Sequence, residues 1–217
     1  MNKHLLVVLT VHLISCGQHK SNIVEEESSP IKKSERKIEN VNETAVVNDT
    51  ANWLNRFRDF RSALYRGDKL KVKTFIDFPI YNPNNEIWYL ASGADDKSLE
   101  LLSDKIKPFT EKEFDKNYDK IFPRTFINSI LKIKTEILLN KGEYETDELI
   151  EEKTAYKIYA TYDRKTNTLI LNLASKTPIT VNDGENDIIE NSEFNVIYYF
   201  DIEMNNVLKF KQVRMAG

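Results

Sequence analysis

The sequence predicts an α+β domain in which N-terminal helices pack on a curved, mostly antiparallel sheet. Two observations lead to this prediction. Apolar residues recur at helical spacing between residues 53 and 137, and they alternate at strand spacing between residues 156 and 215. Beyond about residue 142 the period changes from helix to strand, and no internal repeat is visible. Helices that precede strands in this way favour a layer of helices on one face of a sheet over alternating β-α-β units.

The first predicted helix has a single apolar stripe, because four large residues lie at i, i+4, i+7 and i+11: Trp53, Phe57, Phe60 and Leu64. Gly67 is suited to ending this helix, and Asp68 to capping a short second one. The Phe78-Pro79 step then favours extended backbone. We therefore expect a strand at 78–81, a turn, a returning strand at 87–91 and a short helix at 97–102.

A capping-box spacing marks the next helix, since Thr110 is followed three residues later by Glu113. This helix is expected to end at Pro123, and its apolar stripe consists of Phe114, Tyr118, Ile121 and Phe122. A further helix is expected to run to about Asn140 and to stop at Gly142, with Phe126, Ile130, Ile133 and Ile137 as its stripe.

The second half predicts an antiparallel meander. Residues 156–162 and 168–175 flank a turn and form a hairpin. Residues 178–192 are polar and acidic, and we expect a long mobile loop there. Residues 194–202 alternate strictly as a half-buried strand does, and 207–215 return antiparallel after a turn at 204–206.

Composition excludes several kinds of site. The single cysteine, Cys16, and all three histidines lie before residue 20. The folded part therefore has no disulfide, cysteine nucleophile, Ser-His-Asp triad or zinc site of His and Cys. The net charge is −3 with both signs mixed, so nucleic acid is not an expected partner. The acidic stretches at 143–152 and 183–187 lack calcium-loop spacing, and we expect neither a metal nor a cofactor.

The N-terminus carries the most specific motif. An apolar run, Leu5 to Ile14, is shorter than the roughly 20 residues a membrane-spanning helix needs and is typical of a signal peptide. Residues Leu13 to Cys16, which overlap the end of this run, resemble the lipobox of bacterial lipoproteins. The resemblance implies cleavage after Ser15, a diacylglyceryl thioether on Cys16, further acylation such as palmitate, and a cell-envelope location facing the periplasm or the exterior. The alternatives are an ordinary signal peptide with a chance cysteine, or an uncleaved anchor.

These features divide the chain into a signal peptide (1–15), a lipidated cysteine with a flexible tether (16–51) and one α+β domain (52–217). Residues 18–51 lack aromatic side chains and alternate in charge, so this segment buries too little apolar surface to offset the entropy of ordering. A sorting signal in the acidic cluster at 25–27 is the alternative to a plain spacer.

The order of elements in the domain resembles the cone-shaped superfamily of nuclear transport factor 2 and ketosteroid isomerase. A long helix, a short helix after Gly67-Asp68, a strand at 78–80, further helix and a curved meander carry the resemblance. The insertion at 178–192 and the long third helix pair depart from that pattern. The resemblance implies a sheet curved around an internal cavity.

Three classes of function follow. The first is a non-catalytic module that binds a small apolar ligand or peptide in the cavity, with these lining residues: Tyr198, Phe200, Tyr156 and Tyr118. The second is a protein-interaction or inhibitor subunit of the envelope. The third is an isomerase or lyase that uses these tyrosines with Asp163 or Asp201. No local motif supports a catalytic role for any of them, and amphipathic packing explains the tyrosines better than catalysis does.

Overall fold

A computed structural model describes residues 44–93, 105–182 and 187–217, with side chains from Trp53 onward. The chain divides into two units, Met1–Asn40 and Val41–Gly217, and every described residue belongs to the second. The predicted signal peptide, Cys16 and the tether up to residue 43 lie outside the described residues. The predicted helix at 97–102 lies outside them as well.

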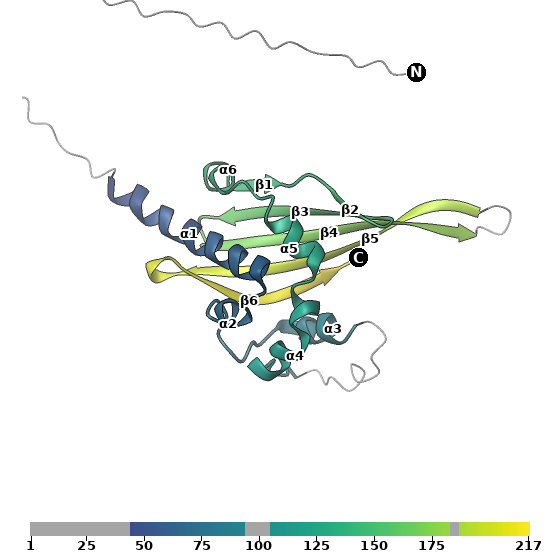
Figure 1. The fold of residues 1–217 in the computed structure, drawn as a ribbon, viewed down its shortest axis with the longest axis horizontal. Coiled ribbons are helices and arrows are strands. Elements are labelled where there is room, and N and C mark those ends of the chain that lie inside the picture. Colours follow the sequence, from purple (N-terminus) through teal and green to yellow (C-terminus); the bar gives the residue numbers. More distant parts are fainter. Residues whose placement is uncertain (1–43, 94–104, 183–186) are drawn as a thin grey trace, which may run out of the picture. The chain divides into compact units, whose positions relative to one another are not determined.

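The described part of the chain forms an α+β domain (Figure 1), as the sequence predicts. Its α-helices are α1 (Thr44–Arg66), α2 (Lys69–Lys73), α3 (Glu86–Ser92), α4 (Glu111–Ile121), α5 (Arg124–Ile130) and α6 (Thr135–Lys141). Its strands are β1 (Glu143–Glu145), β2 (Leu149–Glu151), β3 (Thr154–Asp163), β4 (Thr168–Asn182), β5 (Asp187–Glu203) and β6 (Val207–Ala216).

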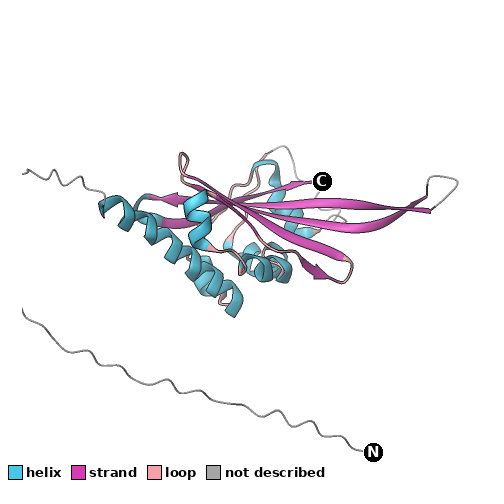
Figure 2. Cartoon of the chain, turned by 90° about the horizontal axis from the view of Figure 1, so that it is seen from above, coloured by secondary structure: helices cyan, strands magenta, loops and turns pink. Residues whose placement is uncertain are grey.

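All strand pairs in the six-stranded sheet are antiparallel, in the order β1-β3-β4-β5-β6, with β2 also paired to β3. The long helix α1 lies along one face of this twisted sheet (Figure 2). Burial alternates along each central strand, because successive side chains point to opposite faces. The face toward the helices carries the buried residues of β4 and β5: Leu169, Leu171, Leu173, Val196, Tyr198, Phe200 and Ile202.

The predicted stripe of the first helix is confirmed, since none of its four residues is more than 1% exposed. Gly67 follows the helix with a φ of +66°. The Asp68 side chain then accepts a hydrogen bond of 2.9 Å from the Lys71 amide and caps α2. Helix α1 begins at Thr44, within the segment predicted as tether and ahead of the predicted boundary at residue 52.

The predicted strand at 87–91 is wrong, because these residues form helix α3. Asn84 and Asn85 both have a φ of +57°, which turns the chain directly into the helix. Ile87 and Ala91, spaced i and i+4, are its buried residues. The predicted strand at 78–81 is reduced to one bridge, between Ile80 and Phe109.

The helix predicted from Phe126 to Asn140 is two helices, α5 and α6, with a break at 131–134. Arg61 of α1 donates hydrogen bonds to the carbonyls of Ile130 and Ile133, at 3.3 and 2.8 Å. A cation from a neighbouring helix thus satisfies carbonyls that the break frees. The predicted capping box is present, with the Thr110 amide donating to Glu113 at 3.1 Å. Gly142, with a φ of +80°, ends α6 as predicted.

The mobile loop predicted at 178–192 is also wrong. Strands β4 and β5 stay in register from Thr168↔Asp201 to Asn182↔Asp187. The pair extends past the rest of the sheet as a long hairpin (Figure 1). Backbone pairing continues there although the side chains are mostly exposed. The prediction was wrong because it took the polar, acidic composition of this stretch as evidence for a loop.

Candidate functional site

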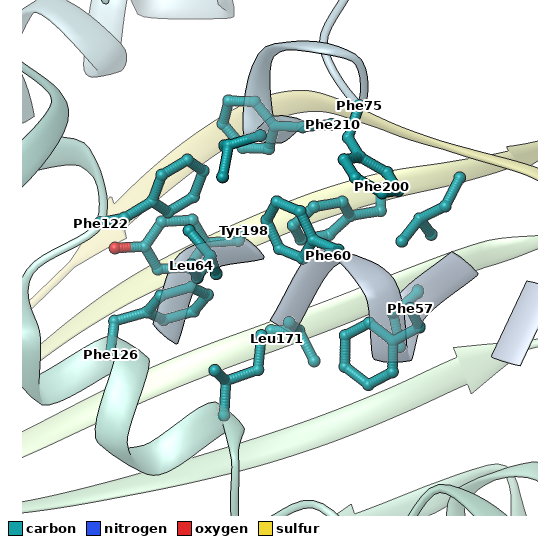
Figure 3. Packing of buried hydrophobic residues seen from close by; sticks show 14 of the residues in the cluster. Phe57, Phe60, Leu64, Phe75, Phe122, Phe126, Leu171, Tyr198, Phe200 and Phe210 are labelled. Carbon is teal, nitrogen blue, oxygen red and sulfur yellow. The ribbon is translucent and has the colours of Figure 1, made fainter. Parts of the chain in front are cut away.

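The predicted ligand residue Tyr198 lies in the packed core. Its side chain is 0% exposed, and its ring centroid is 4.1 Å from that of Phe126 and 5.9 Å from that of Phe122 (Figure 3). The hydroxyl donates a hydrogen bond of 2.9 Å to the Ile121 carbonyl. Burial raises the pKa of Tyr198 well above its usual range, so the hydroxyl stays neutral.

Phe200 belongs to the same ring cluster. Its centroid lies 5.2 Å from that of Phe60 on α1 and 5.5 Å from that of Phe210 on β6. Phe60 also contacts Phe75 and Phe122 edge to face. The space beside Tyr198 and Phe200, where the sequence predicts an open pocket, is therefore filled by aromatic side chains (Figure 3).

Tyr118 shares a neighbour with Tyr198, since both rings pack on Phe122. Its hydroxyl is buried and has no hydrogen-bond partner among the described residues. The Lys69 ammonium lies 4.7 Å from the centre of its ring. Burial, with smaller effects from Asp119 and Asp68, raises the pKa of Tyr118 to about 12. The fourth predicted ligand residue, Tyr156 on β3, is half-buried and packs at the margin of the core.

The two aspartates proposed for an isomerase do not face these tyrosines. Asp163 accepts a hydrogen bond of 2.8 Å from the Lys165 amide in the β3–β4 turn, and this bond lowers its pKa. Asp201 lies 3.9 Å from the Lys211 ammonium. Because Asp201 is one position from Phe200, alternation along β5 places it on the opposite sheet face from the buried rings. The structure therefore gathers no tyrosine–carboxylate pair from the predicted set.

Sequence reasoning missed a groove between α6, β1 and β3. It has a volume of about 490 Å³, and its lining consists of Ile137, Lys141, Glu143, Tyr144, Glu145, Tyr159, Ala160 and Thr161. Glu145 lies 3.6 Å from Lys157 and is thus partly neutralised. Within the described ranges, no cluster of His, Cys, Asp and Glu has the arrangement of a metal site. The groove combines aromatic rings with mixed charge, but neither Tyr198 nor Phe200 lines it.

A second surface lies on the outer part of the β4–β5 hairpin. Pairing of β3 with β4 ends at Lys176, and pairing of β6 with β5 ends at Asn195. Beyond these points the two strands carry the following exposed apolar residues: Ile179, Ile188, Ile189 and Phe194. We refer to residues 177–182 and 187–194 as the outer ribbon. The acidic composition of this stretch was visible in the sequence, but its strand pairing was not.

Comparison of the chain with protein-family models, with curated proteins and with solved structures returned no match. None of the helices in the described ranges has the length and apolar character needed to span a bilayer. The features of the chain that bear on its function are therefore the motifs of its sequence and the two surfaces above.

Proposed function

We propose that this chain is a lipid-anchored bacterial envelope protein whose domain acts by binding another protein. The observation that carries the proposal is the combination of a filled interior with an outer ribbon that leaves apolar side chains uncovered. A domain that binds a small molecule inside the sheet needs an open cavity. A domain that binds a protein needs exposed apolar surface, and the outer ribbon provides it.

The lipobox resemblance at Leu13–Cys16 supports the anchor. Several acyl chains on Cys16 hold a protein stably at a membrane, whereas one chain gives only marginal binding. Replacing Cys16 with Ala is expected to shift the protein from the membrane fraction to the soluble fraction or to leave an uncleaved precursor. If mass spectrometry of the native protein finds Cys16 unmodified, the proposal of a lipid anchor is contradicted.

Cross-linking of the full-length protein in intact cells tests the interaction. We expect a discrete product that contains this chain and one other envelope protein, identified by mass spectrometry. The Cys16→Ala variant serves as control, because loss of the anchor should deplete a product that forms at the membrane. A chain that stays monomeric under cross-linking at native expression would contradict the proposal.

The groove between α6, β1 and β3 supports a second candidate, a site for a small amphipathic ligand. Its volume of about 490 Å³ lies within the usual range for small-molecule pockets, roughly 300–1,000 Å³. A thermal-shift screen of amphipathic compounds tests this candidate, with Tyr159→Ala as the groove variant and Tyr65→Ala, an exposed tyrosine of α1, as the control. A stabilising compound whose effect persists in Tyr159→Ala would show that the groove is not its site.

A further inference from the structure

The outer ribbon is a two-stranded extension of a six-stranded sheet. In the described part of the chain, the outer edges of β4 beyond Lys176 and of β5 before Asn195 pair with no further strand. An isolated two-stranded hairpin is marginally stable in water unless something packs on it. Residues 168–182 of β4 nevertheless pair with residues 187–201 of β5 in one uninterrupted ladder, so the ribbon is an ordered surface on which a partner can dock.

One face of the ribbon continues the core face of the sheet. The register places Leu173 opposite Val196, and both are buried. Since side chains alternate with a period of two, further cross-strand pairs lie on the same face in order toward the tip: Ser175↔Phe194, Thr177↔Ser192, Ile179↔Glu190 and Val181↔Ile188. The helices cover this face at the core, but Ile179, Ile188 and Phe194 are 41%, 38% and 39% exposed.

The charge on the ribbon is predominantly negative. Three carboxylates lie on β5, at Asp187, Glu190 and Glu193. The nearest basic residue, Lys176, is 3.6 Å from Glu193. Glu190 shares the apolar face with Ile179 and Ile188, so a complementary partner must present apolar and basic side chains together.

We propose that the outer ribbon docks a segment of a partner protein that carries both apolar and basic side chains. The apolar residues of that segment contact Ile179, Val181 and Ile188, and its basic residues face Glu190 on the same face of the ribbon. The negative charge disfavours two other occupants. A second copy of the chain would bring like charges together, and an anionic lipid surface would be repelled. This inference rests on the proposed function and identifies the surface that performs it.

Peptide binding to the full-length Cys16→Ala chain tests the chemistry. The probe is a short fluorescent peptide of alternating isoleucine and lysine, compared with the same peptide carrying glutamate for lysine. We expect the lysine peptide to bind and the double variant Ile179→Ser/Ile188→Ser to weaken it about tenfold or more, since two buried aliphatic contacts are lost. Glu190→Lys is expected to weaken binding similarly. The control Ile150→Ser alters an exposed isoleucine of β2 outside the ribbon and should leave binding unchanged.

Thermal melting of each variant establishes that it is folded. We expect all of them to fold, because the substituted side chains are exposed. Equal binding of both peptides, or equal binding by wild type and the double variant, would overturn the proposal. Binding to phosphatidylglycerol vesicles that is lost in Ile179→Ser/Ile188→Ser would overturn the protein partner in favour of a membrane. Dimerisation in sedimentation that is lost in the same variant would overturn it in favour of a second copy of the chain.

A photo-reactive residue at position 192 of the full-length chain in cells separates failure of this inference from failure of the proposed function. Ser192 is exposed and lies on the same face of the ribbon as Glu190 and Ile188, so the reactive group is next to the docked segment and disturbs no packing. A cross-link from this position to the partner found in the general cross-linking experiment is the expected result. A complex that forms without a cross-link from the ribbon, and that survives Ile179→Ser/Ile188→Ser, overturns the ribbon but leaves protein binding intact. Absence of any complex overturns the proposed function itself.

Discussion

Two buried tyrosines of the core differ in how their hydroxyls are satisfied. Tyr198 donates to the Ile121 carbonyl at 2.9 Å, whereas the Tyr118 hydroxyl has no partner in the described part of the chain. Both rings pack on Phe122, so their apolar surroundings are alike. A buried polar group without a partner costs free energy, while a satisfied one contributes modestly. The same Tyr→Phe substitution should therefore have different effects at the two positions.

We expect Tyr198→Phe to lower the free energy of unfolding by about 0.5–1.5 kcal/mol, because one net hydrogen bond is lost. Tyr118→Phe should be neutral or slightly stabilising, because it removes an unsatisfied hydroxyl and keeps the ring. Urea denaturation of both variants at neutral pH is the measurement. A larger loss from Tyr118→Phe than from Tyr198→Phe would contradict the hydrogen-bond assignment.

The raised pKa of Tyr118, about 12 against the usual 10.0, predicts a dependence of stability on alkaline pH. The folded state holds the proton more tightly, so this contribution is fully present below pH 10 and is lost as the pH rises from about 10 to about 12. The slope for one such group is about 1.4 kcal/mol per pH unit. Because phenylalanine has no hydroxyl to titrate, the unfolding free energy of the wild type should fall relative to that of Tyr118→Phe over this window. The difference in favour of the variant should therefore grow with pH, and a difference that is constant with pH would contradict the prediction.

At the scale of secondary-structure elements, α1 determines how the helical layer meets the sheet. Phe60 of α1 contacts Phe200 of β5 at 5.2 Å between ring centroids and Phe75, just after α2, at 5.3 Å. Arg61 on the same helix holds the break between α5 and α6 through two carbonyl hydrogen bonds. One helix thus organises contacts with the sheet and with three other helical segments.

Phe60→Ala is expected to destabilise the domain by about 3–5 kcal/mol, because its side chain is 0% exposed and its removal leaves a cavity among aromatic rings. Phe57→Ala should behave alike, since Phe57 is equally buried. The matched control is Arg58→Ala, which removes a largely exposed ion pair to Glu136 and should cost less than about 1 kcal/mol. Thermal and urea denaturation measure these effects. A neutral Phe60→Ala would mean that α1 does not pack on the sheet.

At the scale of the whole molecule, the chain combines an N-terminal segment predicted to be a tether with a domain that carries the described structure. Limited proteolysis of the full-length protein is expected to cut between Gln18 and Ala51 and to leave a stable fragment that contains Trp53 to Gly217. Because α1 begins at Thr44, the stable fragment is expected to extend beyond Trp53 toward the N-terminus, to about residue 44. Hydrogen-exchange protection of residues 25–45 comparable with that of β4 would contradict the tether.

Local patterns predicted many elements correctly, and two of the errors have different physical causes. The stripe of α1, the capping box at Thr110 and the alternation of β5 depend on residues close in sequence, and all three are present. The prediction of a strand at 87–91 failed because a five-residue apolar segment fits both the helical and the strand period. The turn at Asn84 and Asn85 leads the chain directly into a helix there. The prediction of a loop at 178–192 failed because exposed, charged residues form a loop only where no partner strand is in register with them.

Local sequence patterns were sufficient to predict the class of the domain and the buried stripes of its main helices. Composition alone shows that no His or Cys follows residue 20, and the lipobox resemblance is likewise a local feature. Whether the interior is open or filled depends instead on tertiary packing. The same inward residues, Tyr198 and Phe200, line a cavity or form a core depending on whether helices place Phe60, Phe122 and Phe126 against them. Ring packing of this kind joins residues far apart in the chain, and no local spacing encodes it.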